Sequence, residues 1–368
     1  MTNDRAVAVI TGAESVFPGR ERQDDLWDDF FSAHFGRSRL ARRAFASAGV
    51  QYRHAVASPR CEDVSGWSTG ARMERYVQEA VPLGKNALAG ALDAAGLRAE
   101  DIGLFAMASC TGYATPGVDL RLAADLGMAT TVQRLFIGHM GCYAALPALG
   151  AVSDFVVARG RPAILLCLEL SSLHIQPPTD DLEQVVAHAL FSDAASAVVV
   201  QPSTDDRGCA LGADATARGG GALGLAIVDV AARTDPATAD LMTWEITDLG
   251  FRMGLSRRVP DVLAVYVAPM VADLLARNGV AAEEVDGWAV HPGGPRILDV
   301  VADALALPAD ALVESRSVLS QHGNCSSATA LVVLDEVRRQ RQIDTGRHVV
   351  ALAFGPGLTL YAVLLQAV

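Results

Sequence analysis

The 368-residue sequence lacks both the positive charge and the cysteine patterns that several classes of protein require. Its formal net charge is −12, so it has no excess of Lys and Arg for binding nucleic acid or an anionic membrane. Its six cysteines, at positions 61, 110, 142, 167, 209 and 325, form no CxxC pair and share no repeated spacing. We therefore expect no zinc site, no disulfide framework, and no nucleic-acid or membrane partner.

Signals for export and membrane insertion are also missing. The start, MTNDRAVAVITGAES, contains the acidic Asp4 and only a short apolar run, which predicts no secretory signal and a cytoplasmic location. The last 20 residues carry no charge, but the GPG at 355–357 divides them into two pieces of strand length. We therefore expect two buried strands joined by a tight turn in place of a membrane span.

What the sequence does contain is material for a large core and an approximate internal repeat. With 51% hydrophobic and 20% charged residues, the chain can form two domains or one large integrated unit. Residues 89–107 and 272–290 align at an offset of 183, which places Gly96 on Gly279. Each copy has the pattern of an amphipathic helix that ends at the glycine and is followed by a buried strand.

A second pair of segments supports the repeat. The segments that begin at Gly141 and Gly323 align at an offset of 182, and each again predicts a helix followed by an apolar strand. Chance likeness between helix-strand segments rich in Ala, Leu and Val is the alternative. If the repeat is real, the chain is two similar α/β halves, residues 1–205 and 206–368, with the linker-like segment 212–223 near their junction.

The repeat brings three chemically capable residues into related positions. Cys142 and Asn324 each follow a glycine at a predicted helix start, so two similar halves would place them opposite each other. His291 directly follows the predicted strand VDGWAV, at the carboxyl end where α/β sheets usually bind ligands. Together they suggest a nucleophilic cysteine with a histidine partner and a neutral amide donor.

A helix start favours a reactive thiol because its unpaired N–H groups and dipole lower a cysteine's pKa. Pro147 lies inside the predicted helix and should loosen the turn that carries Cys142, because it disturbs the carbonyl of Tyr143. Each residue also has a structural explanation when taken alone. Cys142 would be a small buried side chain, His291 a loop histidine, and GNCSS at 323–327 a helix cap.

Several motifs closely resemble the type III polyketide synthases, the chalcone synthase family, in a bacterial-type form within the thiolase superfamily. The motifs are PLGKNAL at 82–88, CTGYATPGVD at 110–119, GCYAALPAL at 141–149, ALFSDAASA at 189–197, HPGGPRIL at 291–298, GNCSSATALVVLDE at 323–336 and FGPGLT at 354–359. The resemblance implies a thiolase fold, an αβαβα five-layered sandwich of two pseudo-equivalent halves. It also implies a homodimer and the absence of any metal or redox cofactor.

The resemblance implies an acyltransferase that condenses malonyl-CoA with a starter acyl-CoA, or with a malonyl starter, and cyclises the product to a small phenol, resorcinol or pyrone. By position, Cys142 would carry the acyl chain, while His291 and Asn324 would drive decarboxylation. Phe191 would be the gatekeeper between the CoA tunnel and the cavity. No cofactor is expected beyond the CoA thioesters, which are substrates.

The same resemblance implies a substrate pocket and a CoA site. Two basic positions of the plant pattern fall on Leu40 and Ser47, so only one phosphate-binding arginine carries over. A histidine in the pocket, where plant enzymes have a small hydroxyl residue, should shrink the cavity and add a titratable donor. A second pocket cysteine is similar to that of bacterial members, some of which build their product from malonyl units alone. The pocket residues are Cys110, Thr111, Thr115, Ser171, Leu173, His174, Trp244, Phe251, Met253, Ser326, Gly355 and Pro356, and the CoA residues are Arg43, Gly293 and Gly294.

Two alternatives stay open at this point. A carrier-protein-dependent β-ketoacyl synthase of the type that initiates fatty-acid synthesis would share the fold and the residue types, although HPGGPRIL and FGPGLT favour the polyketide family. The chain could instead be a catalytically silent thiolase-fold subunit that binds an active partner. The presence of Cys142, His291, Asn324 and Phe191 argues against a silent subunit.

Overall fold

The computed structural model describes residues 7–203 and 224–368, so the predicted boundary at 205/206 and the linker 212–223 lie outside the described residues. One sheet of nine strands runs through the molecule. The first half contributes β1 (Val7–Val16), β4 (Leu104–Ala108), β5 (Gln133–Ile137), β6 (Ala163–Leu170) and β7 (Asp193–Ser203); the second contributes β8 (Leu225–Thr234), β11 (Val285–Val290), β12 (His348–Gly355) and β13 (Thr359–Ala367).

The strand order repeats from one half to the other. The sheet runs β5-β4-β6-β7-β1 in the first half and continues β8-β13-β12-β11 in the second. In both halves the inner three strands are antiparallel neighbours, and the next pair, β6–β4 or β12–β11, is parallel. The halves meet where β1 pairs with β8 over only two residue pairs.

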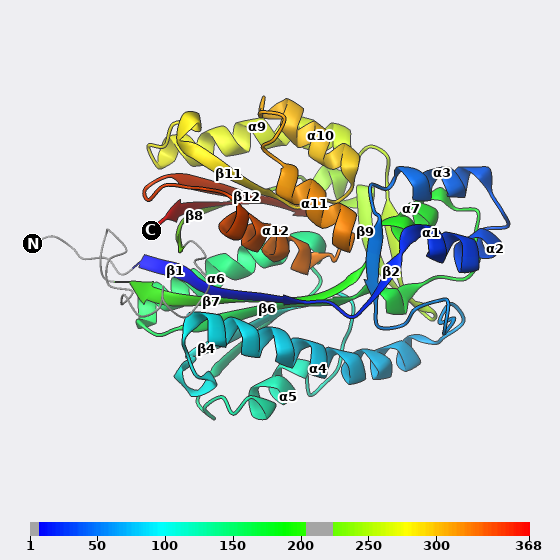
Figure 1. Ribbon diagram of the computed structural model, residues 1–368, viewed down its shortest axis with the longest axis horizontal. Helices are drawn as coiled ribbons and strands as arrows, with labels where there is room; N and C mark the ends of the chain where they lie inside the picture. The colour runs from blue at the N-terminus through cyan, green and yellow to red at the C-terminus, as the bar shows by residue number, and fades with distance from the viewer. Residues whose placement is uncertain (1–6, 204–223) are drawn as a thin grey trace, which may run out of the picture.

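Helices divide the structure into five layers, as Figure 1 shows from bottom to top. Helices α4 and α5 cover the outer face of the first half-sheet, α6 and α12 lie between the half-sheets, and α9 and α10 cover the outer face of the second. This arrangement is the αβαβα sandwich that was predicted. The helices are α4 (Thr69–Ala95), α5 (Val118–Asp125), α6 (Ala145–Arg159), α9 (Val259–Arg277), α10 (Pro295–Ala304), α11 (Val313–His322) and α12 (Ser327–Gln340).

Apolar side chains hold the layers together because each sheet face and helix stripe must be removed from water. In the middle, Leu149 of α6 and Leu331 of α12 are fully buried in one core with the facing strands of both halves. Phe105 of β4 lies in the core under α4, and Leu274 of α9 lies in the core of the second half.

The repeated segments occupy equivalent places. Helix α4 ends at Gly96 and α9 is followed by Gly279, both with positive φ (66° and 68°), and each then leads into the parallel strand of its half, β4 or β11. Helices α6 and α12 each precede the neighbouring strand, β6 or β12. The two strands at the C-terminus, β12 and β13, form an antiparallel pair across the 355–357 turn, as predicted.

Two stretches, Gly141–Arg159 and Val259–Arg277, are long and apolar enough to cross a membrane by length and composition alone. Both have structural reasons to be apolar. The first includes α6, which has a half-sheet on each side, and the second is α9, which covers the second half-sheet.

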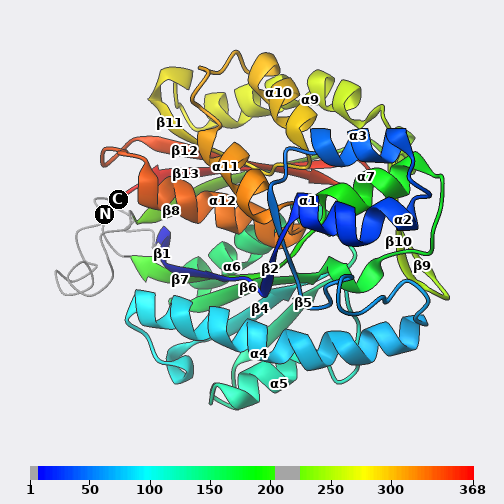
Figure 2. The same cartoon turned by 45° about the vertical axis from the view of Figure 1, so that its right-hand side comes forward.

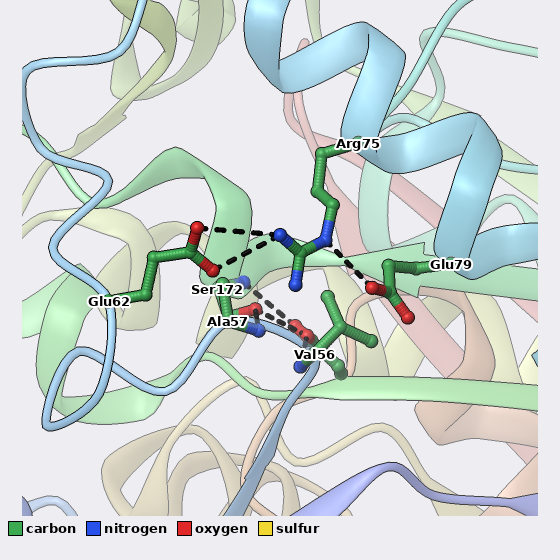
Figure 3. A network of polar contacts seen from close by, with 7 residues as sticks. Val56, Ala57, Glu62, Arg75, Glu79 and Ser172 are labelled. Carbon is green, nitrogen blue, oxygen red and sulfur yellow. Dashed lines mark hydrogen bonds and ion pairs between the residues drawn. The ribbon is translucent and has the colours of Figure 1, made fainter.

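Shorter elements cap one end of the sandwich. Figure 2 shows α3 and α7 side by side at this end, next to the β9–β10 hairpin. The loop after β3 is tied down by Arg75 of α4, whose guanidinium bonds to Glu62 and Glu79 (Figure 3). The capping elements are β2 (Gly19–Arg22), α1 (Gln23–Leu26), α2 (Ser32–His34), α3 (Arg39–Ser47), β3 (Tyr52–Ala55), α7 (Leu182–Leu190), β9 (Met242–Thr247) and β10 (Gly250–Leu255).

Candidate active site

Cys142 lies in a 3₁₀ turn, Gly141–Tyr143, directly before α6. The Ala144 N–H donates to the Gly141 carbonyl at 3.1 Å, so the turn is tighter than an α-helical one. Gly141 has φ 68°, and a Cβ there would lie 2.7 Å from Cδ of Pro356. Only glycine fits this corner. The corner holds Cys142 in a buried position, with a relative exposure of 6%.

Asn324 and Phe191 are joined although they lie far apart in the chain. They form an isolated parallel bridge in which the Asn324 N–H donates to the Leu190 carbonyl and the Ser192 N–H donates to the Asn324 carbonyl, both at 2.9 Å. The Asn324 Oδ1 accepts the Ser326 N–H at 2.9 Å, which leaves the amide NH₂ as its donor. A hydrogen bond from the Asn324 side chain favours the Cys142 thiolate.

His291 follows β11 and is 1% exposed. Its N–H donates to the Leu352 carbonyl at 2.8 Å, which fixes the backbone, but neither ring nitrogen has a hydrogen-bond partner within residues 7–203 and 224–368. Burial lowers the pKa of His291 to about 3, so the free side chain is neutral at pH 7. A buried neutral imidazole with both nitrogens free can donate one proton and accept another.

One cavity of about 330 Å³ is lined by all four residues that were predicted to act together. Cys142, Phe191, His291 and Asn324 share it with residues of α3, α7 and α10 and with the segment that leads into α9. A small inner cavity of about 20 Å³ lies next to it, and Cys142 and Phe191 line both. Phe191 also lines a third cavity of about 60 Å³ under α7, which places its ring at a junction.

Most of the predicted pocket residues line the inner cavity, and the others lie elsewhere. Thr115 is exposed beside Tyr113 and lines a separate surface hollow, so this chain does not bring it to the pocket. Leu173 is buried and lines none of these cavities, and Gly355 packs under the ring of Tyr143. Phe251 and His174 line only the third cavity. The inner cavity is lined by Cys110, Thr111, Ser171, Trp244, Met253, Ser326 and Pro356 of the predicted set.

The prediction that His174 adds a titratable donor to the pocket is wrong. Its Nε2 donates to the Thr111 carbonyl at 2.7 Å, and its Nδ1 accepts the Phe251 N–H at 3.0 Å. Its ring stacks on Phe251 at 4.6 Å and meets Trp244 edge-on at 5.5 Å. Burial lowers its pKa to about 4, so His174 is a neutral structural bridge that packs behind Trp244.

The expected low pKa of Cys142 is also not found in the free site. Burial raises the pKa of this thiol to about 12, and the negative charge of Glu169 adds to the rise, whereas hydrogen bonds from Ser326 and Asn324 oppose it. In the resting site Cys142 is therefore a thiol and His291 a neutral imidazole.

Glu169 is a site residue that the sequence reasoning missed. It lies on β6, is fully buried, and accepts hydrogen bonds from Thr111 Oγ1 at 2.7 Å, the Cys110 N–H at 3.0 Å and the Ser327 hydroxyl. The Cys110 thiol also points at its carboxylate, at 3.5 Å. Burial and this neighbouring charge raise the pKa of Cys110 well above its ordinary value, which keeps it a thiol. One acidic residue within the apolar run AILLCLEL was the available signal.

Of the three residues predicted to bind CoA, two line the 330 Å³ cavity and one does not. Gly293 and Gly294 line the 330 Å³ cavity, but Arg43 does not; it is exposed on α3 next to Ala44, which does. Two arginines that the sequence reasoning did not single out, Arg257 and Arg296, line this cavity. Among the described residues no group of three or more His, Cys, Asp or Glu side chains is placed to hold a metal ion.

The five-layered sandwich and the buried Cys, His and Asn of one cavity define a thiolase-fold enzyme of the condensing class. Comparisons with known proteins narrow this class. The chalcone and stilbene synthase models match residues 56–204 (N-terminal domain) and 227–368 (C-terminal domain). The chain therefore belongs to the chalcone and stilbene synthase family, the type III polyketide synthases.

Individual relatives agree with this assignment. The chain is 36% identical to a 1,3,6,8-tetrahydroxynaphthalene synthase of Streptomyces peucetius subsp. caesius, over 99% of this chain and 94% of that one. It is 32% identical to the alpha-pyrone synthesis polyketide synthase-like Pks18 of Mycobacterium tuberculosis, over 81% and 73%. Among solved structures, PKS-I of the brown alga Ectocarpus siliculosus superposes with a TM-score of 0.89 at 26% identity over 100% of both chains. The tetrahydroxynaphthalene synthase of Streptomyces coelicolor A3(2) gives 0.87 at 26% identity over 98% and 99%.

Proposed function

We propose that this type III polyketide synthase loads an acyl group from a CoA thioester onto Cys142 and extends it with malonyl-CoA in one buried cavity. The observation that carries this proposal is the shared lining of the 330 Å³ cavity by Cys142, His291, Asn324 and Phe191. A nucleophile, a proton carrier, an amide donor and an apolar ring around one space are the parts that acyl transfer and decarboxylation need.

Acyl loading begins with proton transfer from the Cys142 thiol to the free nitrogen of His291. The thiolate attacks the thioester carbonyl carbon, the C–S bond to CoA breaks, and His291 returns its proton to the leaving CoA thiolate. Forming the ion pair of thiolate and imidazolium places two charges in a dry site, and their mutual attraction offsets the cost of desolvation when they are close. The products are acyl-Cys142 and free CoA.

In the extension step, His291 and Asn324 act as hydrogen-bond donors. The His291 ring N–H and the Asn324 amide donate to the thioester oxygen of malonyl-CoA, where negative charge develops as the C–C bond to the carboxylate breaks and CO₂ leaves. The ring of Phe191 offers the carboxylate an apolar neighbour, which favours its loss as neutral CO₂. The enolate carbon attacks the acyl-Cys142 carbonyl, expels the Cys142 thiolate and leaves a longer β-ketoacyl-CoA for another cycle.

A small starter suits the inner cavity. Its volume is only about 20 Å³, because Trp244 fills it from β9 and is held by a bond from its Nε1–H to the Cys110 carbonyl at 2.7 Å. We propose a malonyl or similarly short starter and a small phenolic or pyrone product. The relatives named for tetrahydroxynaphthalene and alpha-pyrone synthesis fit this product range.

The phosphates of CoA need cations on an acidic protein. We propose that the exposed Arg43 on α3 keeps its family role, and that Arg257 and Arg296, which line the outer cavity, take the two places left by Leu40 and Ser47. Substitution of Arg257 by Ala should raise KM for malonyl-CoA several-fold and leave KM for malonyl-N-acetylcysteamine, which has no phosphate, unchanged. An equal rise with both thioesters would contradict the proposal.

We also propose that the protein is a homodimer. The outer edge of the first half carries exposed apolar side chains at Tyr113 (62% exposed), Leu120, Leu135 and Phe136, and β5 ends the sheet there. Thr115, predicted as a pocket residue, lies on this same face. Sedimentation equilibrium should give twice the chain mass, and Phe136→Asp should shift the protein toward the single chain; a wild-type monomer would refute the dimer.

Incubation of the purified protein with malonyl-CoA and a panel of acyl-CoAs tests the reaction itself. We expect CO₂ release, an acyl adduct on Cys142 by mass spectrometry, and a cyclised product with no added metal or redox cofactor. Dialysis against EDTA should leave the rate unchanged, because no step uses a metal. Absence of both adduct and CO₂ with every thioester would favour a silent subunit. A cytoplasmic location is part of the proposal.

A further inference from the structure

We propose that Arg53 is a positioning residue for decarboxylation, because its guanidinium fixes the backbone bridge that carries Phe191 and Asn324. This inference rests on the proposed function, in which those two residues act on malonyl-CoA. Arg53 belongs to β3 and lines neither the outer cavity nor the inner one, although it lines the third cavity of about 60 Å³ together with Phe191. It therefore acts through the residues that it holds.

The bridge between Phe191 and Asn324 is tightly built. Its two backbone hydrogen bonds join the end of α7 to the segment before α12, so a movement of one strand moves the other. Gly323 completes the contact with φ 71°, and a Cβ there would lie 3.0 Å from both the Leu190 carbonyl oxygen and Cβ of Ser192. No side chain fits between the segment after α7 and the segment before α12, and the position of Asn324 therefore follows that of α7.

Arg53 holds the α7 side of this bridge. Its Nη1 donates to the Phe191 carbonyl at 3.2 Å and to the His188 carbonyl. His188 lies in the last turn of α7, where carbonyls have no helical partner, and Phe191 is the residue that caps the helix. The guanidinium lies 5.4 Å from the ring centre of Phe31 and 5.9 Å from that of Phe45. Burial lowers the pKa of Arg53 to about 10, so it stays charged at neutral pH and favours the negative end of the helix.

The strand that carries Arg53 is itself fixed to both sides of the bridge. The His54 N–H donates to Ser192 Oγ at 2.8 Å, and the His54 ring bonds to His322, two residues before Asn324, at 3.0 Å. Further along, the Val56 N–H donates to Asp193 Oδ2 at 2.9 Å, in the network drawn in Figure 3. The β3 segment thus gives Arg53 a rigid base from which to hold α7.

The backbone of Cys142 is supported separately, although Ser326 and Asn324 hydrogen-bond its side chain; of the causes that shift the pKa of this thiol, the Asn324 bond is the smallest. Cys142 lies in the turn before α6 that is set by Gly141 and Pro356, and Arg53 contacts neither of these residues. A change at Arg53 should therefore move Phe191 and Asn324 together while Cys142 keeps its place. Since decarboxylation depends on the first two and acyl loading on Cys142, the two half-reactions should respond differently.

The test compares Arg53→Lys and Arg53→Met with Arg72→Lys. Lys keeps the charge but offers a compact ammonium in place of a planar fork, so it cannot hold both carbonyls in the same geometry. Arg72 is a matched control, because it is fully buried and donates only to backbone carbonyls, those of Leu173, Ile175, Ser65 and Trp67. Each protein is assayed for CO₂ release from malonyl-CoA, for the second-order rate of Cys142 alkylation by iodoacetamide, and for its melting temperature.

We expect Arg53→Lys to lower kcat for CO₂ release about tenfold, with KM for malonyl-CoA and the alkylation rate within twofold of wild type. Arg53→Met should lose more decarboxylation, and Arg72→Lys should lower the melting temperature without changing the ratio of the two rates. Equal loss of both rates in Arg53→Lys, or no loss of either while wild type decarboxylates, would overturn the positioning role. Failure of wild type itself to decarboxylate would instead refute the proposed function. If Arg53→Met does not fold, Arg53→Lys alone decides.

Discussion

The ionisation of Cys142 gives the sharpest prediction, because the free site disfavours the thiolate that the reaction needs. Burial raises the pKa of Cys142 to about 12 and lowers that of His291 to about 3, so both groups are neutral alone at pH 7. We predict that the thiolate forms only as an ion pair with His291. In His291→Gln, which keeps a polar side chain but cannot take the proton, Cys142 should keep its high pKa.

The size of the effect follows from these values. At pH 7 a thiol with a pKa of about 12 is ionised to about one part in 10⁵, roughly 3,000-fold less than an ordinary thiol with a pKa near 8.5. A thiolate is more nucleophilic when its thiol has a higher pKa. With a Brønsted slope of 0.4–0.5, the rise in pKa from about 8.5 to about 12 makes the Cys142 thiolate roughly 40-fold more reactive than an ordinary thiolate. Cys142 of His291→Gln should thus react about 100-fold more slowly than an ordinary cysteine.

Iodoacetamide labelling followed by peptide mass spectrometry measures this rate, and the exposed Cys61 in the same digest is the reference thiol. In wild type we expect Cys142 to react at least as fast as Cys61 at pH 7 and to reach a plateau below pH 8. In His291→Gln the Cys142 rate should rise tenfold per pH unit through pH 10 without a plateau, because the group remains below its pKa. Superimposable pH profiles for the two proteins would refute the ion-pair reasoning.

Three further predictions concern neighbouring residues. Cys142→Ala should abolish the acyl adduct, whereas Asn324→Ala should keep the adduct and lose CO₂ release at least 100-fold, as adduct mass and CO₂ assays will show; equal loss of both in the Asn324 variant would be evidence against its role. Trp244→Ala should enlarge the inner cavity, so that hexanoyl-CoA becomes a better starter relative to acetyl-CoA in product mass spectra. Gly141→Ala should reduce turnover and the melting temperature, because its Cβ would meet Pro356 at 2.7 Å and its φ is 68°.

Much of the fold could be predicted from the sequence because local patterns determine it. The glycines at 96 and 279 end helices with positive φ, and the apolar runs after them become the parallel strands β4 and β11. Nearly equal offsets, 183 and 182, in two pairs of segments were enough to infer two halves, because equivalent segments bury the same faces. They also placed Cys142 and Asn324 three residues before α6 and α12, respectively.

The environment of each site residue could not be predicted in the same way, because it depends on contacts between segments far apart in the chain. Histidine is a residue type that can titrate in a pocket, but both ring nitrogens of His174 are hydrogen-bonded, one to the Thr111 carbonyl and the other to the Phe251 N–H. The pKa of Cys142 depends on burial by both halves and on Glu169, which arrives from β6. The loop after β4 brings Cys110 and Thr111 to the inner cavity, but four residues further on Thr115 lines a separate surface hollow.

Cys142 and Asn324 occupy equivalent positions in the two halves, but different contacts hold them, and this difference has a chemical reason. Under the proposed mechanism Cys142 first attacks a thioester carbonyl and then presents its own acyl carbonyl to the enolate from the same place, so a rigid corner at Gly141 suits it. Under the same mechanism Asn324 meets a charge that appears only when CO₂ leaves, and it does so together with Phe191, so a shared backbone bridge suits that pair. Because the supports are separate, substitutions that loosen α7 should change the ratio of decarboxylation to loading, whereas substitutions around Gly141 should change both.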